Sequence, residues 1–293
     1  MTKIEREILK TLVFFDVFSQ PLSEFEIYNY LNFKCDFFDL QKSLESLGDR
    51  ICFQDGFYFL PGKEHIISER FKRYNYFKRK IKIAKRFSSL ISIIPFIKGV
   101  AVSNIISSHN LKNDSDIDFF IITSSNRIWL ARFFCTGIAK ILNLRPNKKT
   151  KKDKICLSFY ISEDNLALKK YLYSEDDLYF IYWIIGLEFL FDRDNIFKSL
   201  KEQNAWLENY LPNSYKVEDV VLNKVNLSDK NIGLLEKLAR KIQMRIMPEK
   251  LKCQNCDLGG VILGDDIIKL FLEDKRPLFI EKFKDNLKNV YDF

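Results

Sequence analysis

Histidine, glycine and proline are scarce in this 293-residue chain, which contains two His, ten Gly and seven Pro. Long disordered or low-complexity segments are usually rich in Gly or Pro and poor in aromatic residues, whereas this chain contains 27 Phe, so we do not expect them. The histidines, His65 and His109, have no ligand-like spacing relative to the Cys-x-x-Cys pair Cys253 and Cys256. A structural zinc site is therefore not expected.

The chain also lacks a disulfide framework and long hydrophobic runs. Its six cysteines are scattered and lie mostly in apolar contexts, where cysteine behaves as a small buried hydrophobe. The N-terminus is too charged for a signal peptide. The longest apolar tracts, 90–106 and 181–191, are interrupted by Pro95 and Lys98 or are too short to span a bilayer. These absences favour a cytoplasmic protein with no membrane partner.

What the chain does contain is enough apolar and aromatic material, 47% and 15% of its residues, to build a substantial core in two or three domains. The net charge of +8 is concentrated in two basic segments, 63–85 and 145–154. Basic residues interleaved with aromatics such as Phe71 and Tyr74 can neutralise nucleic-acid phosphates, although a solvated helix face is the commoner outcome. Nucleic acid is therefore a possible partner, but it is not the favoured one.

The stretch that points to chemistry is a pair of carboxylates, Asp116 and Asp118, followed at once by the apolar run 119–122. Side chains alternate along a strand, so both carboxylates project from one face and can hold one hard divalent cation. The alternative is a polar turn before a buried strand, because Asp and Ser commonly bond to their own backbone in turns. A matching apolar run at 99–102 favours the first interpretation.

An apolar run ending in small polar residues at 99–104, a short connection and the Asp-x-Asp strand together resemble the nucleotidyltransferase fold over residues 96–162. DNA polymerase beta, aminoglycoside nucleotidyltransferases and minimal nucleotidyltransferases share this fold. In that family a Gly-Ser turn holds the nucleotide phosphates, and the Asp pair with a third acid holds magnesium. The resemblance therefore implies Mg²⁺ at Asp116 and Asp118. It also implies nucleotide binding by three residues, Ser103, Asn104 and Ser115.

Two departures from the family pattern leave activity open. The Gly-Ser turn falls on Asn104-Ile105, and a β-branched Ile resists the close-approach geometry of such a turn and offers no hydroxyl. The third expected strand, 154–161, contains no acid; Asp153 precedes it and Glu163 follows it. The sequence is thus compatible with an active transferase and with a degenerate fold that binds a nucleotide or a protein without turnover.

The first 62 residues resemble a winged-helix domain. Apolar periodicity and a cap at Ser23 predict helices at 4–15, after residue 23 and at 36–47, and Asp55-Gly56 between two short apolar runs is a hairpin signal. The third helix has one Lys against three acids, so it is poorly suited to contact phosphates or bases. A protein-docking or structural role is expected rather than that of a DNA-binding regulator.

Residues 63–95 are predicted to form a connecting helix that ends before Pro95 and leaves its charged side chains in solvent. Its inward-facing residues are expected to be Phe71, Phe77, Ile81, Ile83 and Phe87. Another helix is predicted at 126–144. Beyond residue 163 the chain is expected to be helical, including the segments 177–191 and 265–272.

Together these patterns predict an α+β protein with four segments. They are a winged helix at 1–62, a connecting helix at 63–95, a nucleotidyltransferase-like core with a small mixed sheet at 96–162, and a helical region at 163–293. This order resembles uncharacterised bacterial proteins that pair a winged helix with a nucleotidyltransferase domain. The expected function is Mg²⁺-dependent transfer of NMP from a nucleoside triphosphate to an acceptor hydroxyl that the sequence does not identify.

Overall fold

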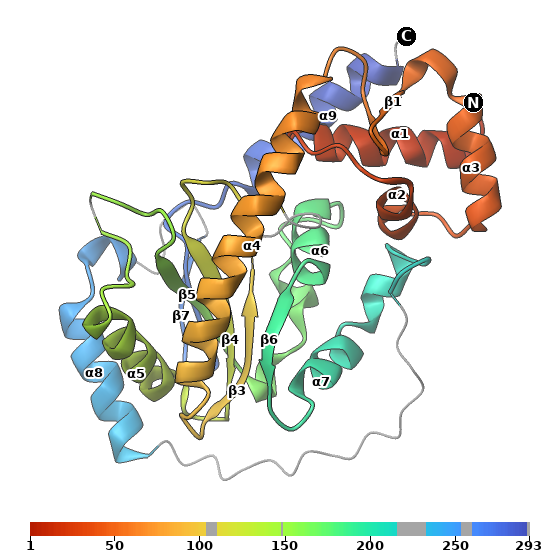
Figure 1. The fold of residues 1–293 in the computed structure, drawn as a ribbon. Coiled ribbons are helices and arrows are strands. Elements are labelled where there is room, and N and C mark those ends of the chain that lie inside the picture. Colours follow the sequence, from red (N-terminus) through yellow and green to blue (C-terminus); the bar gives the residue numbers. More distant parts are fainter. Residues whose placement is uncertain (104–109, 148, 216–232, 253–259, 292–293) are drawn as a thin grey trace.

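The computed structural model describes residues 1–293 except 104–109, 148, 216–232, 253–259 and 292–293. The described chain is α+β, with a six-stranded mixed sheet, a two-stranded hairpin and helices at both ends (Figure 1). Within this part of the chain, no helix combines the length and the apolar character that crossing a bilayer requires.

Three helices and the hairpin form at the N-terminus where the sequence predicts them. They are α1 (Lys3–Asp16), α2 (Glu24–Tyr30), α3 (Phe37–Ser46), β1 (Cys52–Gln54) and β2 (Phe57–Phe59). Ser23 caps α2 through a capping box, in which its hydroxyl accepts a hydrogen bond from the Glu26 N–H while the Glu26 carboxylate accepts one from the Ser23 N–H. The hairpin turn places Asp55 at φ 52° and Gly56 at φ 83°, as a tight two-residue turn requires.

The helix predicted at 63–95 is confirmed as α4 (His65–Ile91), but the prediction that its charged side chains lie in solvent was wrong for three of them, and the prediction that Phe71 faces inward was also wrong. Arg70, Arg73 and Lys80 are only 2%, 7% and 0% exposed, whereas Phe71 is 48% exposed. The reason is that α4 runs from the N-terminal helices across to the sheet (Figure 1), so that Arg70 meets the Glu26 carboxylate and the Pro21 carbonyl, while Lys80 meets Asp153 and the Ser115 carbonyl. Burying a carboxylate is costly unless it is paired and hydrogen-bonded, and a cation from the helix supplies that pairing.

The six strands are arranged in the order β6-β3-β4-β5-β8-β7, and β4 and β5 are the parallel pair. Their bounds are β3 (Ile97–Val102), β4 (Ile117–Thr123), β5 (Ile155–Ser162), β6 (Glu188–Asp192), β7 (Val261–Leu263) and β8 (Ile267–Leu270). A parallel pair needs a crossover, and α5 (Ile128–Ile141) supplies it, close to the predicted 126–144. Strands β3, β4 and β5 were predicted from the sequence.

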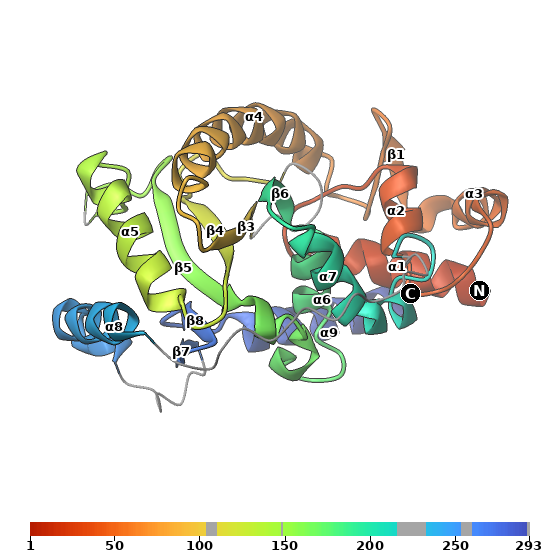
Figure 2. The same ribbon diagram turned by 90° about the horizontal axis from the view of Figure 1, so that it is seen from below.

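Both faces of the sheet are covered (Figure 2). Phe119 and Ile121 of β4 pack in one core with residues of α4 and α5, whereas Phe120 and Ile122 pack on the other side with residues of α6 (Leu178–Ile185) and α7 (Ile196–Gln203). The second core also contains residues of α1 and of α9 (Arg276–Tyr291), so the N-terminal helices share it with the sheet. A strand buried on both faces explains the continuous apolar run after the acid pair.

The prediction that the chain is helical beyond residue 163 was wrong for three segments. Residues 188–192 form β6, and 261–263 and 267–270 form β7 and β8. Gly186 ends α6, after which the chain extends and pairs with β3. A short apolar run has no helix-specific period, and pairing with a distant strand decides its structure. Helices α7, α8 (Leu234–Ile246) and α9 are confirmed.

Candidate metal and nucleotide site

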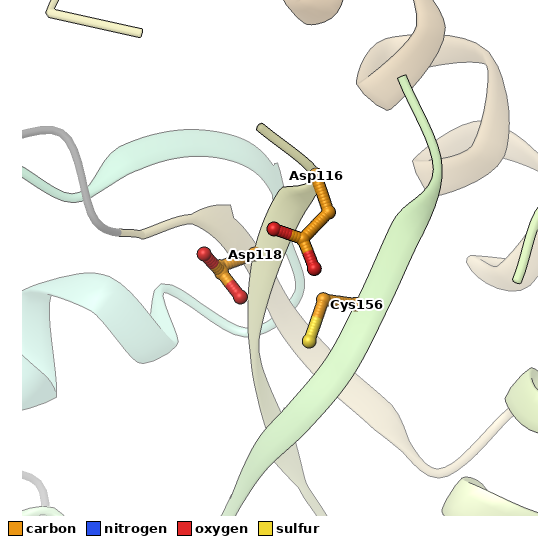
Figure 3. A group of neighbouring side chains, drawn as sticks. All are labelled: Asp116, Asp118 and Cys156. Carbon is orange, nitrogen blue, oxygen red and sulfur yellow. The ribbon is translucent and has the colours of Figure 1, made fainter. Parts of the chain in front are cut away.

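Three side chains from two neighbouring strands meet at one end of the parallel pair. Asp116 directly precedes β4, Asp118 is its second residue, and Cys156 on β5 is the register partner of Asp118. One carboxylate oxygen of each Asp and the Cys156 Sγ all lie within 4.8 Å of one another. Figure 3 shows the three side chains extending into the same space. The acid pair predicted from the sequence is therefore brought together.

The backbone of β4 and β5 explains why a thiol joins the two carboxylates. The register shifts between the pair Asp118–Cys156 and the pair Phe120–Phe159, so β5 uses one residue more than β4 over this interval. This irregularity lets Cys156 face the same side as Asp118 while Phe159 faces the same side as Phe120. Asp118 is 9% exposed, because the buried aromatic face of β4 begins directly after it.

A buried cation from α4 fixes the turn that leads into the acid pair. Lys80 Nζ donates to the Ser115 carbonyl oxygen and, at 3.0 Å, to Asp153 Oδ1. Arg79 also binds Asp153, with 3.1 Å between Nε and Oδ2. Ser115 immediately precedes Asp116, and Asp153 lies just before β5. Lys80 therefore ties together the starts of the two strands that carry the site.

The electrostatics of this cluster follow from burial and pairing. Burial lowers the pKa of the Lys80 ammonium, and its hydrogen bond to Asp153 offsets only part of that effect. Burial alone would raise the pKa of Asp153, but the hydrogen bonds and charges of Lys80 and Arg79 hold it below its ordinary value. Burial, followed by the charge of Asp118, raises the pKa of the Cys156 thiol. The thiol is therefore protonated at neutral pH when only the protein surrounds it.

The predicted nucleotide-binding residues are found in three different situations. Ser103 follows β3 and is 1% exposed; its N–H donates to the Asp118 carbonyl at 2.8 Å, and its hydroxyl lies 3.4 Å from the same oxygen. The Ser115 hydroxyl donates to the Lys112 carbonyl at 3.0 Å. Asn104 lies outside the described residues. The assignment of these residues to a nucleotide stays a prediction.

The third member of this cluster is Cys156, which was expected from the sequence to be a small buried hydrophobe. Asp153 is paired with Lys80 and Arg79, and Glu163 at the far end of β5 accepts a hydrogen bond from the Ser125 N–H at 3.0 Å. Neither acid belongs to the cluster around Asp116 and Asp118. The alignment of β5 with β4 in parallel register is the signal that would have identified Cys156.

The donor set can be compared with what Mg²⁺ requires. Mg²⁺ binds oxygen, keeps several waters and is commonly held by one or two carboxylates, so Asp116 and Asp118 fit it. Among the described residues none donates a hydrogen bond to the Asp116 carboxylate, which leaves that side chain available. The Cys156 sulfur is not a ligand that Mg²⁺ uses.

Comparisons of the chain with protein-family models, with curated proteins and with solved structures found no match.

Proposed function

We propose that this protein binds a nucleoside triphosphate with a divalent cation and transfers NMP to an acceptor hydroxyl. The observation that carries the proposal is the convergence of Asp116 and Asp118 at the start of β4, within a strand–helix–strand unit formed by β4, α5 and β5. On this proposal residues 96–162 are a nucleotidyltransferase-type core and residues 1–62 a winged helix. The acceptor is not specified by the residues of the site.

The roles of the side chains follow from their chemistry. A cation held by Asp116 and Asp118 would neutralise the phosphates of the nucleotide and orient them for attack on the α-phosphorus. Lys80 holds the turn before Asp116 and so fixes the direction of the first carboxylate. Exposed lysines of the basic loop, such as Lys149 and Lys151, are available for the triphosphate.

The test is metal-dependent nucleotide binding followed by transfer. Fluorescent ATP is titrated into the protein with Mg²⁺ or Mn²⁺, and transfer is then followed with α-³²P-labelled NTPs and candidate acceptors. We expect Asp116→Asn or Asp118→Asn to weaken cation-dependent binding by at least about tenfold, because ligand removal costs more than the loss of a supporting contact. Asp114→Asn is the matched control, since Asp114 is an exposed acid of the same run. Equal binding by all four proteins would overturn the proposal.

A second candidate is a nucleotide-binding module without turnover. It is favoured by the thiol of Cys156 where the family has a third acid, and by the engagement of the Ser103 hydroxyl with the β4 backbone. The sequence Asn104-Ile105 in place of Gly-Ser points the same way. Nucleotide binding that depends on the acid pair, without label transfer to any acceptor, would favour this module over the transferase.

Sequence-specific DNA binding by the N-terminal helices is less well supported. Lys42 of α3 lies over the Phe38 ring, 4.3 Å from its centre, and Phe38 itself is 64% exposed. An exposed aromatic surface with three acids on or beside the helix suits a protein contact better than a phosphate backbone. Salt-dependent DNA binding that is lost in Lys42→Ala would reverse this preference.

A further inference from the structure

We infer that the acid pair and Cys156 form a site that selects a thiophilic divalent cation of the Zn²⁺ class over Mg²⁺. The inference rests on the proposed metal site and adds its selectivity. It follows from the donor set, two carboxylate oxygens and one sulfur, that the two strands bring together. Thiolate ligands favour softer metals, whereas all-oxygen sets suit Mg²⁺.

The spacing of the three side chains suits a shared ion. An oxygen and a sulfur that bind the same Zn²⁺ are separated by at most the sum of the two bond lengths, about 4.3–4.5 Å. The ligand atoms here lie within 4.8 Å of one another, so small side-chain rotations close the site.

Cys156 differs from a cysteine that only fills space. Cys135 of α5 is 0% exposed in the core between that helix and the sheet. Cys156 is partly accessible, and its Sγ lies within 4.8 Å of an oxygen of each carboxylate, with a side-chain hydrogen bond to Asp118 (Figure 3). Cys156 therefore belongs to a polar cluster, and its sulfur and the two carboxylates are donor types that zinc uses.

The completed site would have three protein ligands and an open fourth position, the arrangement typical of catalytic rather than structural zinc. On binding, the Cys156 thiol releases its proton to solvent and its sulfur joins the cation. The fourth position is then available to a water or to a phosphate oxygen of the nucleotide. The site thus suits a role with a phosphate-bearing ligand better than a purely structural one.

The experiment uses the full chain carrying Cys253→Ser and Cys256→Ser, because that Cys-x-x-Cys pair can itself chelate soft metals. Cd²⁺ and Co²⁺ are titrated alone as probes, and thiolate-to-metal charge transfer is read in the ultraviolet spectrum. We expect a stoichiometric band that disappears in Cys156→Ser and in the Asp116→Asn/Asp118→Asn double variant. Cys52→Ser, a change on the hairpin strand β1, is the control that keeps the band.

A variant that should reverse the metal preference tests the selectivity through a gain of Mg²⁺ affinity as well as a loss of Zn²⁺ affinity. Cys156→Asp should lower the Zn²⁺ affinity and raise the Mg²⁺ affinity, each by about tenfold, because it converts the donor set to three carboxylates. Mg²⁺-dependent nucleotide binding without a thiolate band would overturn the selectivity and leave the proposed function intact. Failure of the protein to bind any of these cations or the nucleotide would overturn both.

Discussion

Two buried cations on the same helix, Arg70 and Lys80 of α4, are used in different ways. Arg70 Nη2 donates to both carboxylate oxygens of Glu26, at 2.7 and 2.9 Å, and its Nη1 donates to the Pro21 carbonyl at 2.6 Å. Its guanidinium also lies 4.6 Å from the centre of the Phe57 ring. Both side chains of this pair are almost fully buried, at 3% and 9% exposure. The pair joins α4 to the N-terminal helices and the hairpin.

Lys80 is just as buried, but its partners lie beside the candidate site. It binds the Ser115 carbonyl and Asp153, which stand at the starts of the two strands that carry the acid pair and the thiol. The same helix therefore contributes one buried cation to the packing of the N-terminal helices and another to the candidate site. Arg70 joins α4 to the N-terminal helices, whereas Lys80 fixes the backbone at Ser115, directly before Asp116.

The largest expected effect is on stability, at the Arg70 end. Arg70→Met should lower the free energy of unfolding by about 3–5 kcal/mol, because it leaves the buried Glu26 carboxylate without its cation. Urea denaturation followed by circular dichroism measures the change. Adding Glu26→Gln should recover part of the loss, and Lys72→Met, at an exposed position of α4, should have little effect. An unchanged midpoint in Arg70→Met would contradict the assignment.

Lys80→Met should have a smaller effect on stability, about 1–3 kcal/mol, because Arg79 still binds Asp153. Its larger consequence should be a 10–100-fold (order-of-magnitude) loss of cation affinity, as expected for a group that orients a metal ligand. Calorimetric titration with Mn²⁺ measures it, with the exposed Lys78→Met as control. If folded Arg70→Met loses cation affinity as strongly as Lys80→Met does, the claim that only Lys80 supports the metal site is contradicted.

Acid pH should weaken the Asp153 cluster. Because the pKa of Asp153 is lower in the folded protein than its ordinary 3.8, its contribution is complete above that pH and is lost as pH falls through the folded value. Asp153→Asn should therefore cost about 1–2 kcal/mol at neutral pH and less below pH 3.8. Urea titrations at both pH values test this. A difference that grows on acidification would show the sign to be wrong.

Local signals predicted much of this fold. The helix cap at Ser23, the Asp55-Gly56 turn and the apolar runs that became β3, β4 and β5 each depend on neighbours in sequence. Strands β6 and β8 were not predicted, because their structure is decided by pairing with the distant strands β3 and β5.

The same distinction applies to the candidate site. Asp116 and Asp118 were identified from alternation along one strand, which needs no knowledge of the fold. Cys156 and the burial of Lys80 depend on the register of β5 and on the course of α4, and neither is written in a local pattern. Long-range packing therefore decided the residues that sequence reasoning missed.

The most direct measurement is the binding of Mn²⁺, followed by the loss of its free-ion electron paramagnetic resonance signal. We predict one cation bound per chain in the wild-type protein and in Asp114→Asn, and none at the same concentration in the Asp116→Asn/Asp118→Asn double variant. Identical Mn²⁺ binding by the double variant and the wild type, or no binding by either, would contradict the central claim that these two carboxylates hold a metal.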